Sequence, residues 1–108
     1  MGKFLIQKAK NGEYYFNLKA DNGQTILTSE MYTAKPACKN GFESVQKNCS
    51  FEDRYDRKVS TNKKHFFHLK STNGQVIGSS EMYESTAGME TGIASVKKNG
   101  TSTTIVEE

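Results

Sequence analysis

Apolar and polar residues alternate at the beginning of the chain, and Asn-Gly pairs interrupt the alternation. Along positions 13–20, one side carries Tyr14, Phe16 and Leu18, and the other carries Tyr15, Asn17 and Lys19. This period of two is typical of a strand with one buried face. The pairs Asn11-Gly12 and Asn22-Gly23 favour tight turns, because glycine adopts positive φ without steric cost. The pattern predicts a three-stranded antiparallel meander, with strands at residues 3–9, 13–20 and 24–31.

The period then changes to that of a helix. The apolar positions, spaced as i, i+3, i+4 and i+7, are Cys38, Gly41, Phe42 and Val45. Pro36 fits this helix only in its first turn, and Thr33 or a neighbour would cap the free N–H groups. Glycine on the inner stripe costs about 1 kcal/mol relative to alanine. We therefore expect the helix backbone to approach the sheet closely at Gly41.

The chain repeats this arrangement. Residues 14–48 recur as residues 65–99, and the alignment at this offset of 51 positions has 16 identities in 35 positions without a gap. The second copy has strands expected at residues 54–60, 64–71 and 75–82, and its helix stripe consists of Met89, Gly92, Ile93 and Val96. The same offset indicates a short edge strand at residues 102–106. Two like units that cannot each bury a core usually fold against each other.

The predicted fold class is therefore α+β. We expect a single domain over residues 1–108, built of two tandem βββα repeats, residues 1–50 and 51–108. We expect the repeats to form one pseudo-twofold antiparallel-sheet domain, with a single sheet or a pair of sheets, and the two helices to cover its apolar faces.

The motifs of the second repeat resemble those of the bacterial YegP-like proteins. They read Asn73-Gly74-Gln75, Ser80-Glu81-Met82-Tyr83 and Gly92-Ile93-Ala94-Ser95-Val96, and the first repeat departs from them only in its helix, at Gly41-Phe42-Glu43-Ser44-Val45. The match runs from about Phe4 to Thr101. The resemblance implies tandem βββα repeats in an intertwined α+β fold. It implies no reaction and no catalytic residues, because the family is one of unknown function.

Composition narrows the class of protein. The chain has 108 residues and a net charge of +3, from 15 basic and 12 acidic residues, which is less basic than a dedicated nucleic-acid binder. No segment is apolar for long enough to be a signal peptide or to span a membrane. We expect a cytoplasmic protein that is a monomer, in which Cys38 and Cys49 are free thiols.

The residues that could carry chemistry alone are not shared by the repeats. His65 and His68 lie three apart on a strand, so their side chains point to opposite faces and cannot bind one metal ion together. Cys38 lies on the apolar stripe, as a small buried hydrophobe does, and Cys49 follows the helix end, where we expect exposure. No glycine-rich phosphate loop is present. We expect no metal, no cofactor and no catalytic site.

The repeated Ser-Glu pairs form the best polar constellation. The candidate ligand-binding residues are Ser29, Glu30, Tyr32, Ser80, Glu81 and Tyr83. A catalytic carboxylate would need to be held near a reacting group, and two symmetry-related carboxylates start in similar environments, so an enzyme is the remote alternative. The structural alternative is that Ser and Glu bind the start of the following helix.

A second candidate surface lies on the outer strand face. It consists of Tyr15, Lys19, Phe66 and Lys70, an aromatic and basic set on which single-stranded nucleic acid could stack. The structural alternative is that these residues pack against strands of the other repeat. Our leading interpretation is a non-enzymatic protein with a duplicated binding surface for a protein partner or small ligand, and nucleic-acid binding is the alternative.

Overall fold

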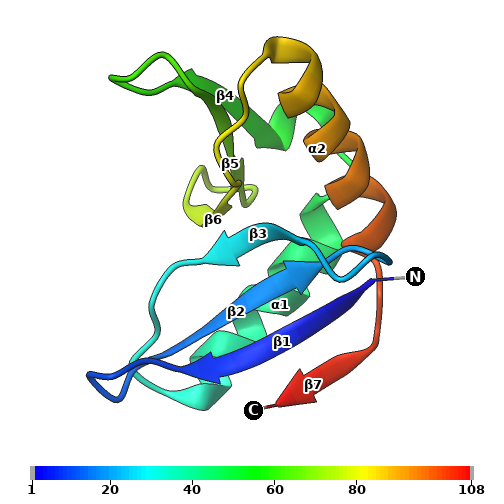
Figure 1. Cartoon of the computed structure of the whole chain (residues 1–108). Helices are drawn as coiled ribbons and strands as arrows, with labels where there is room; N and C mark the ends of the chain where they lie inside the picture. The colour runs from blue at the N-terminus through cyan, green and yellow to red at the C-terminus, as the bar shows by residue number, and fades with distance from the viewer. Residues whose placement is uncertain (1, 108) are drawn as a thin grey trace.

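The computed structural model describes residues 2–107 of the chain. The strands are β1 (Lys3–Lys8), β2 (Tyr14–Lys19), β3 (Thr25–Ser29), β4 (Tyr55–Val59), β5 (His65–Lys70), β6 (Val76–Ser79) and β7 (Ile105–Glu107). The helices are α1 (Lys35–Asn48), the short 3₁₀ helix η1 (Glu52–Arg54) and α2 (Thr86–Asn99). The βββα-βββα order, the final edge strand and the α+β class are as predicted (Figure 1).

All strands of the described chain belong to one sheet, in the order β4-β5-β6-β3-β2-β1-β7. Neighbours from β4 to β1 are antiparallel, as the Asn-Gly turns predict for β1–β2, β2–β3 and β5–β6. The prediction of a purely antiparallel sheet is wrong at one edge, because β7 runs parallel to β1. All the other elements of the fold lie between β1 and β7 in the chain, which permits this direction, since a parallel neighbour requires a long connection rather than a hairpin.

Both helices lie on the same face of the sheet, and α1 is seen behind β1 and β2 in Figure 1. Below α1, the rings of Phe4, Phe16 and Phe42 pack with centroid distances of 5.5–6.1 Å. Below α2, Tyr55 and Phe67 pack edge to face at 5.6 Å. The sheet is twisted, so that α1 also contacts β5 and β6, and α2 also contacts β2 and β3. Each repeat thus covers part of the other.

The repeats meet along a short seam between β3 and β6. Thr28 lies opposite Ser79, and Ser79 is the residue that corresponds to Thr28 in the second repeat. The pseudo-twofold axis therefore passes between these two residues. Next to the axis, Leu27 corresponds to Gly78. A Cβ atom on Gly78 would lie 2.8 Å from the Thr28 carbonyl oxygen and 3.1 Å from Leu27 Cγ. One large side chain fills the axis, and the second repeat therefore has glycine there.

Local backbone features follow the sequence with two exceptions. Gly12, Gly23 and Gly74 have φ of +83° to +87° in their turns, as expected. Lys63, which stands where the first repeat has Gly12, also has a positive φ, of +65°. The expected cap of α1 is wrong: Ala34 occupies the N-cap, and no side chain caps the helix.

Candidate functional site

Two grooves lie at opposite ends of the β3–β6 seam. The first groove has a volume of about 690 Å³ and is lined by Glu30, Met31, Tyr32, Ala37, Asn40, Gly41, Ser44, Ser71, Asn73, Gln75, Val76 and Ile77. The second groove has a volume of about 530 Å³ and is lined by Lys19, Gly23, Gln24, Thr25, Ile26, Glu81, Met82 and Tyr83.

The two grooves share pseudo-equivalent walls, although residues of α1 line only the first groove and Lys19 lines only the second. In each, the Glu-Met-Tyr segment of one repeat faces the Asn-Gly-Gln turn and the strand after it in the other repeat. The segments that line the first groove, residues 30–32 and 75–77, correspond at the offset of 51 to residues 81–83 and 24–26 of the second. The two motifs that the repeats share most closely therefore meet across the seam.

Methionine is exposed in both grooves. Met31 is 53% exposed and Met82 is 55% exposed, although large apolar side chains are usually covered. The sequence interpretation missed both, because it treated methionine as part of a strand end and the Asn-Gly-Gln segment only as a turn. The recurrence of both motifs was a usable signal, but their meeting depends on the order of the strands in the sheet.

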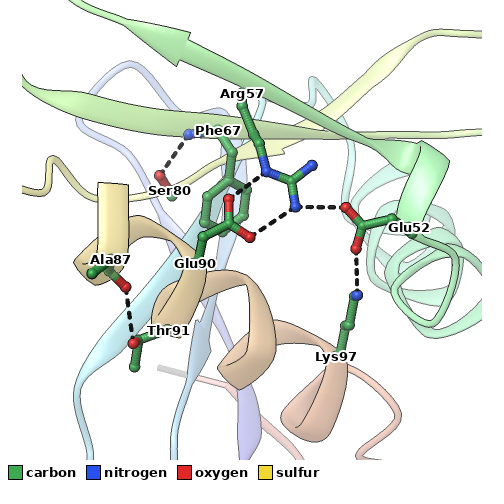
Figure 2. A network of polar contacts seen from close by, with 8 residues as sticks. All are labelled: Glu52, Arg57, Phe67, Ser80, Ala87, Glu90, Thr91 and Lys97. Atoms are coloured by element: carbon green, nitrogen blue, oxygen red, sulfur yellow. Dashed lines mark hydrogen bonds and ion pairs between the residues drawn. The ribbon is translucent and has the colours of Figure 1, made fainter. Parts of the chain in front are cut away.

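The serines of the Ser-Glu pairs are buried and bonded within the chain. Ser29 Oγ accepts a hydrogen bond from the Phe16 amide at 2.9 Å and donates one to the Glu30 carbonyl at 2.8 Å. Ser80 repeats this arrangement: it accepts a hydrogen bond from the Phe67 amide (Figure 2) and donates one to the Glu81 carbonyl. The serines thus connect neighbouring strands. The structural alternative, in which they bind the start of the following helix, is wrong for both.

The tyrosines of the two segments are half-buried against the helices. Tyr32 and Tyr14 exchange backbone hydrogen bonds of 2.7 and 2.8 Å, and Tyr83 and His65 do the same. The rings then cover glycine on the helix: a Cβ atom on Gly92 would lie 2.6 Å from Tyr83 Cζ, and one on Gly41 would lie 2.8 Å from Tyr32 Cζ. Burial raises the pKa of both tyrosines. The inner glycines make room for tyrosine rather than for the sheet backbone.

Glu30 and Glu81 are exposed at matched positions of the two grooves. Within residues 2–107, neither carboxylate takes part in an ion pair or a side-chain hydrogen bond. Most other carboxylates have a cationic partner, such as Asp56 with Lys70 at 3.1 Å. The repeats therefore leave one free carboxylate at each groove.

The second candidate surface lies on the sheet face opposite the helices, which we call the open face. Tyr15, Lys19, Phe66 and Lys70 all lie there, on β2 and β5, and each is half-buried. They do not pack against strands of the other repeat, because β3 and β6 stand between β2 and β5 in the same sheet.

Polar side chains link the strands of the open face. Asn17 donates a hydrogen bond to Thr28 Oγ1 at 2.9 Å and accepts one from Gln7. Lys19 donates to Thr25 Oγ1 at 2.7 Å, and the Phe66 ring contacts the His68 ring edge to face at 5.5 Å. The aromatic and basic groups of this face are therefore partly occupied within the chain.

The isolated candidates do not form a reactive site. Cys38 and Cys49 are buried free thiols, and burial raises the pKa of each. The expected exposure of Cys49 is wrong, because its side chain packs beside Gly100. His65 and His68 point to opposite faces of β5, and burial and Lys58 lower the pKa of His68. Among the described residues, no three His, Cys, Asp or Glu side chains converge as a metal site.

A network of charged groups closes the second repeat near the β4 edge. Figure 2 shows Arg57 of β4 between Glu52 of η1 and Glu90 of α2, with hydrogen bonds of 2.5 Å to each. Lys97 of α2 binds the other oxygen of Glu52 at 2.6 Å. These bonds lower the pKa of Glu52, chiefly through Lys97, and that of Glu90, chiefly through Arg57. The network links β4, η1 and α2, and its two cations neutralise its two carboxylates.

Comparison with known proteins places these observations in a family. The family described as "Domain of unknown function (DUF1508)" matches residues 9–56 and residues 60–107, two segments that differ by the same offset as the repeats. The chain is similar to UPF0339 protein YegP of Escherichia coli K12, with 50% identity over 96% of this chain and 94% of that protein.

Two solution NMR structures share the fold. The protein of unknown function yegP from E. coli superposes with a TM-score of 0.94 and 48% identity, over 99% of this chain and 92% of that one. A UPF0339 protein of Shewanella oneidensis gives a TM-score of 0.93 and 49% identity, over 98% of this chain and 90% of that one. Within residues 2–107, no helix has the length and apolar character needed to cross a bilayer.

Proposed function

The chain belongs to the DUF1508 family, and from its paired grooves we propose that it is a non-enzymatic binding protein. It works as a cytoplasmic monomer that holds a protein segment or a small ligand in each groove. The observation that carries this proposal is the meeting of the two shared motifs across the seam, with Met31 and Met82 exposed at matched positions. Pockets with exposed apolar groups and a few polar side chains are typical of binding sites.

Several features favour binding over catalysis. Glu30 and Glu81 occupy like positions, whereas acid–base catalysis works best with two groups in distinct environments. The two thiols are buried with a raised pKa, which disfavours the thiolate that would act as nucleophile. Methionine is flexible and polarisable, and it adapts its shape to different partners. The contacts of the buried serines leave Glu30, Tyr32, Glu81 and Tyr83 as the ligand-facing part of the predicted set.

Methyl NMR of the two groove methionines tests this proposal. The full chain, labelled with ¹³C at the methionine methyl groups, is mixed with the low- and high-molecular-mass fractions of a nuclease-treated bacterial lysate. We expect one fraction to shift the Met31 and Met82 signals. Proteins or ligands retained by the immobilised chain should be lost when both residues become glutamate.

The matched control is the pair Phe51→Glu and Val59→Glu, which changes two other exposed apolar side chains, 53% and 63% exposed, that line neither groove. The control should retain what the wild-type chain retains. Identical retention by the Met31→Glu/Met82→Glu variant, together with unmoved methyl signals in both fractions, would rule out the grooves as binding sites.

The open face supports a second candidate function, the binding of single-stranded nucleic acid. Tyr15 and Phe66 supply rings, and Lys19 and Lys70 supply charge, on a face that no described helix covers. Phosphate contacts make such binding fall steeply with salt. Fluorescence anisotropy of labelled oligo-dT and oligo-U at low salt should then show affinity that Tyr15→Ala/Phe66→Ala reduces. Absence of binding by the folded chain would end this candidate.

A further inference from the structure

The backbone at the two grooves carries unused hydrogen-bonding groups. Within residues 2–107, neither the N–H nor the C=O of Met31 has a hydrogen-bond partner, and the same holds for Met82. Their neighbours are held: Tyr32 and Tyr83 exchange two backbone bonds each with β2 and β5, and the Glu30 amide donates to the Ile77 carbonyl at 3.2 Å. Backbone groups are strong donors and acceptors. Each groove therefore presents a methionine with a free amide and carbonyl, next to a tyrosine that is held by two backbone bonds.

The facing wall of each groove includes the start of a strand. In the first groove it consists of Gln75 and the first two residues of β6, and in the second it consists of Gln24 and the first two residues of β3. The β3–β6 ladder pairs Thr28 with Ser79 and Ser29 with Gly78, and the Glu30–Ile77 hydrogen bond extends it by one step towards the first groove. Beyond this bond, Met31 and Val76 line the groove without a backbone hydrogen bond between them. A space between two segments that are not paired with each other matches an extended chain, which proteins often bind by adding it to a strand.

Each groove presents one carboxylate that can bind a cation. Lys19 also lines the second groove, where its ammonium group donates a hydrogen bond to Thr25 Oγ1 at 2.7 Å. Glu30 and Glu81 are exposed carboxylates without an ion-pair partner in the described chain, at matched positions beside the free backbone of Met31 and Met82. The protein as a whole has a net charge of +3, so a long basic run would be repelled. A single basic group at each groove would pair with the Glu30 or Glu81 carboxylate without the repulsion that a long basic run would meet.

Resting on the proposed function, we infer that the occupant of each groove is an extended peptide segment of a partner protein with adjacent basic and apolar residues. The lysine or arginine lies opposite Glu30 or Glu81, and the apolar side chain lies against Met31 or Met82. The two occupant residues are adjacent because the glutamate and methionine of each groove are adjacent, and opposed residues of paired strands project to the same side. Two like grooves on one rigid body also favour a partner with two such segments.

A small capped-peptide library tests the inference. Each peptide is acetylated and amidated and has a threonine host sequence that favours extended chain. It carries Lys, Arg, Gln or Glu next to Leu, Met or Ser, in either order, so that parallel and antiparallel addition are both tested. Binding to the full chain is followed by ¹⁵N amide shifts of residues 30–32 and 81–83 and by the methionine methyl signals. We expect Lys-Leu and Arg-Leu peptides to bind roughly 3-fold or more tightly than Gln-Leu, as an exposed charge pair allows.

The variant Glu30→Gln/Glu81→Gln should abolish the difference between Lys-Leu and Gln-Leu peptides, while leaving the weaker affinity for Gln-Leu in place. The matched control is Glu43→Gln, which neutralises an exposed carboxylate of α1 that lines neither groove. It should keep the preference for the basic peptide.

Three outcomes would overturn the inference. The first is equal affinity for Lys-Leu and Gln-Leu peptides, the second is a preference that survives in the glutamine variant, and the third is no binding by any basic member at millimolar concentration. Spermidine is included as a free cation. If equimolar spermidine displaces the bound peptide, the grooves bind a small cation rather than a peptide, and the inference is likewise overturned. If lysate components still depend on Met31 and Met82 in these cases, the proposed function stands and only the peptide assignment fails.

Discussion

At the scale of single residues, glycine and tyrosine positions explain each other. The inner helical stripe of both repeats contains glycine, at Gly41 and Gly92, and the sequence alone suggests a close approach of two backbones. The structure instead places the Tyr32 and Tyr83 rings in that space. The tyrosines in turn end the segments that line the two grooves. Glycine at these positions lowers helix stability, but it leaves room for the tyrosine rings that form part of the groove walls.

Replacing Gly92 with alanine should therefore destabilise the protein, although alanine is the better helix former. The new Cβ would lie 2.6 Å from Tyr83 Cζ, which forces the ring to move. Overpacking of this kind costs about 1–3 kcal/mol, and the gain in helix propensity returns about 1 kcal/mol. We expect the free energy of unfolding, measured by urea denaturation, to fall by about 1 kcal/mol.

Two further variants make this test specific. In a Tyr83→Ala background the ring is absent, and Gly92→Ala should then raise the free energy of unfolding by up to about 1 kcal/mol. Gly88→Ala in the same helix meets only ordinary contacts, 3.4 Å from Ser85 Oγ and 3.6 Å from Tyr83 Cδ1, so it should not destabilise. A Gly92→Ala protein as stable as the wild type would contradict the explanation.

At the scale of elements, local patterns predicted the strands and helices, whereas contacts between the repeats escaped prediction. The alternation around Phe16 and the stripe around Val45 act within one element, and both elements are present. The parallel direction of β7 and the meeting of Met31 with the Gln75 segment depend on which strands become neighbours. The positive φ of Lys63 was also missed, because this turn has no glycine and only its equivalence to Gly12 indicates the conformation.

The first strands of the two repeats, β1 and β4, also differ in the side chains that they place on the helix-covered face. Ile6 of β1 is 2% exposed and belongs to the core beneath α1. Its counterpart in β4 is Arg57, which binds Glu52 and Glu90 (Figure 2). The β1 edge is covered by β7, whereas β4 is the other edge of the sheet. A charged, partly exposed network suits an edge strand, because charge discourages pairing with other chains.

The network should make stability depend on pH in one direction. Hydrogen bonds from Lys97 and Arg57 lower the pKa of Glu52, and Arg57 lowers that of Glu90, below their values in the unfolded chain. The stabilisation is therefore complete above the unfolded carboxyl pKa of about 4.3 and is lost as pH falls through the lower folded pKa. Arg57→Gln should lower the thermal midpoint at pH 7, and the difference from wild type should shrink towards pH 3.

Lys47→Gln provides the control, because Lys47 is an exposed lysine of α1 that forms no ion pair within residues 2–107. It loses the same charge and should leave the midpoint nearly unchanged at both pH values. A pH-independent effect of Arg57→Gln would assign its role to packing of the side chain rather than to its charge.

At the scale of the whole molecule, the two repeats are parts of one cooperative unit. The seam places β3 and β6 side by side, each helix contacts strands of both repeats, and β7 from the end of the chain pairs with β1 at its beginning. The grooves exist only where the repeats meet. A single repeat would therefore lack both part of its core and both candidate sites.

Matched core substitutions in the two repeats test this cooperativity. Val45 and Val96 occupy equivalent positions and are each 0% exposed. Changing either to alanine removes two buried methyl groups and leaves a cavity, which should cost about 2–3 kcal/mol. We expect backbone amide signals of β2 and of β5, followed by NMR in increasing urea, to disappear at one common midpoint in each variant. Earlier loss of β2 in the Val45→Ala protein, with β5 still folded, would show instead that the repeats unfold independently and that the grooves can open while half of the fold persists.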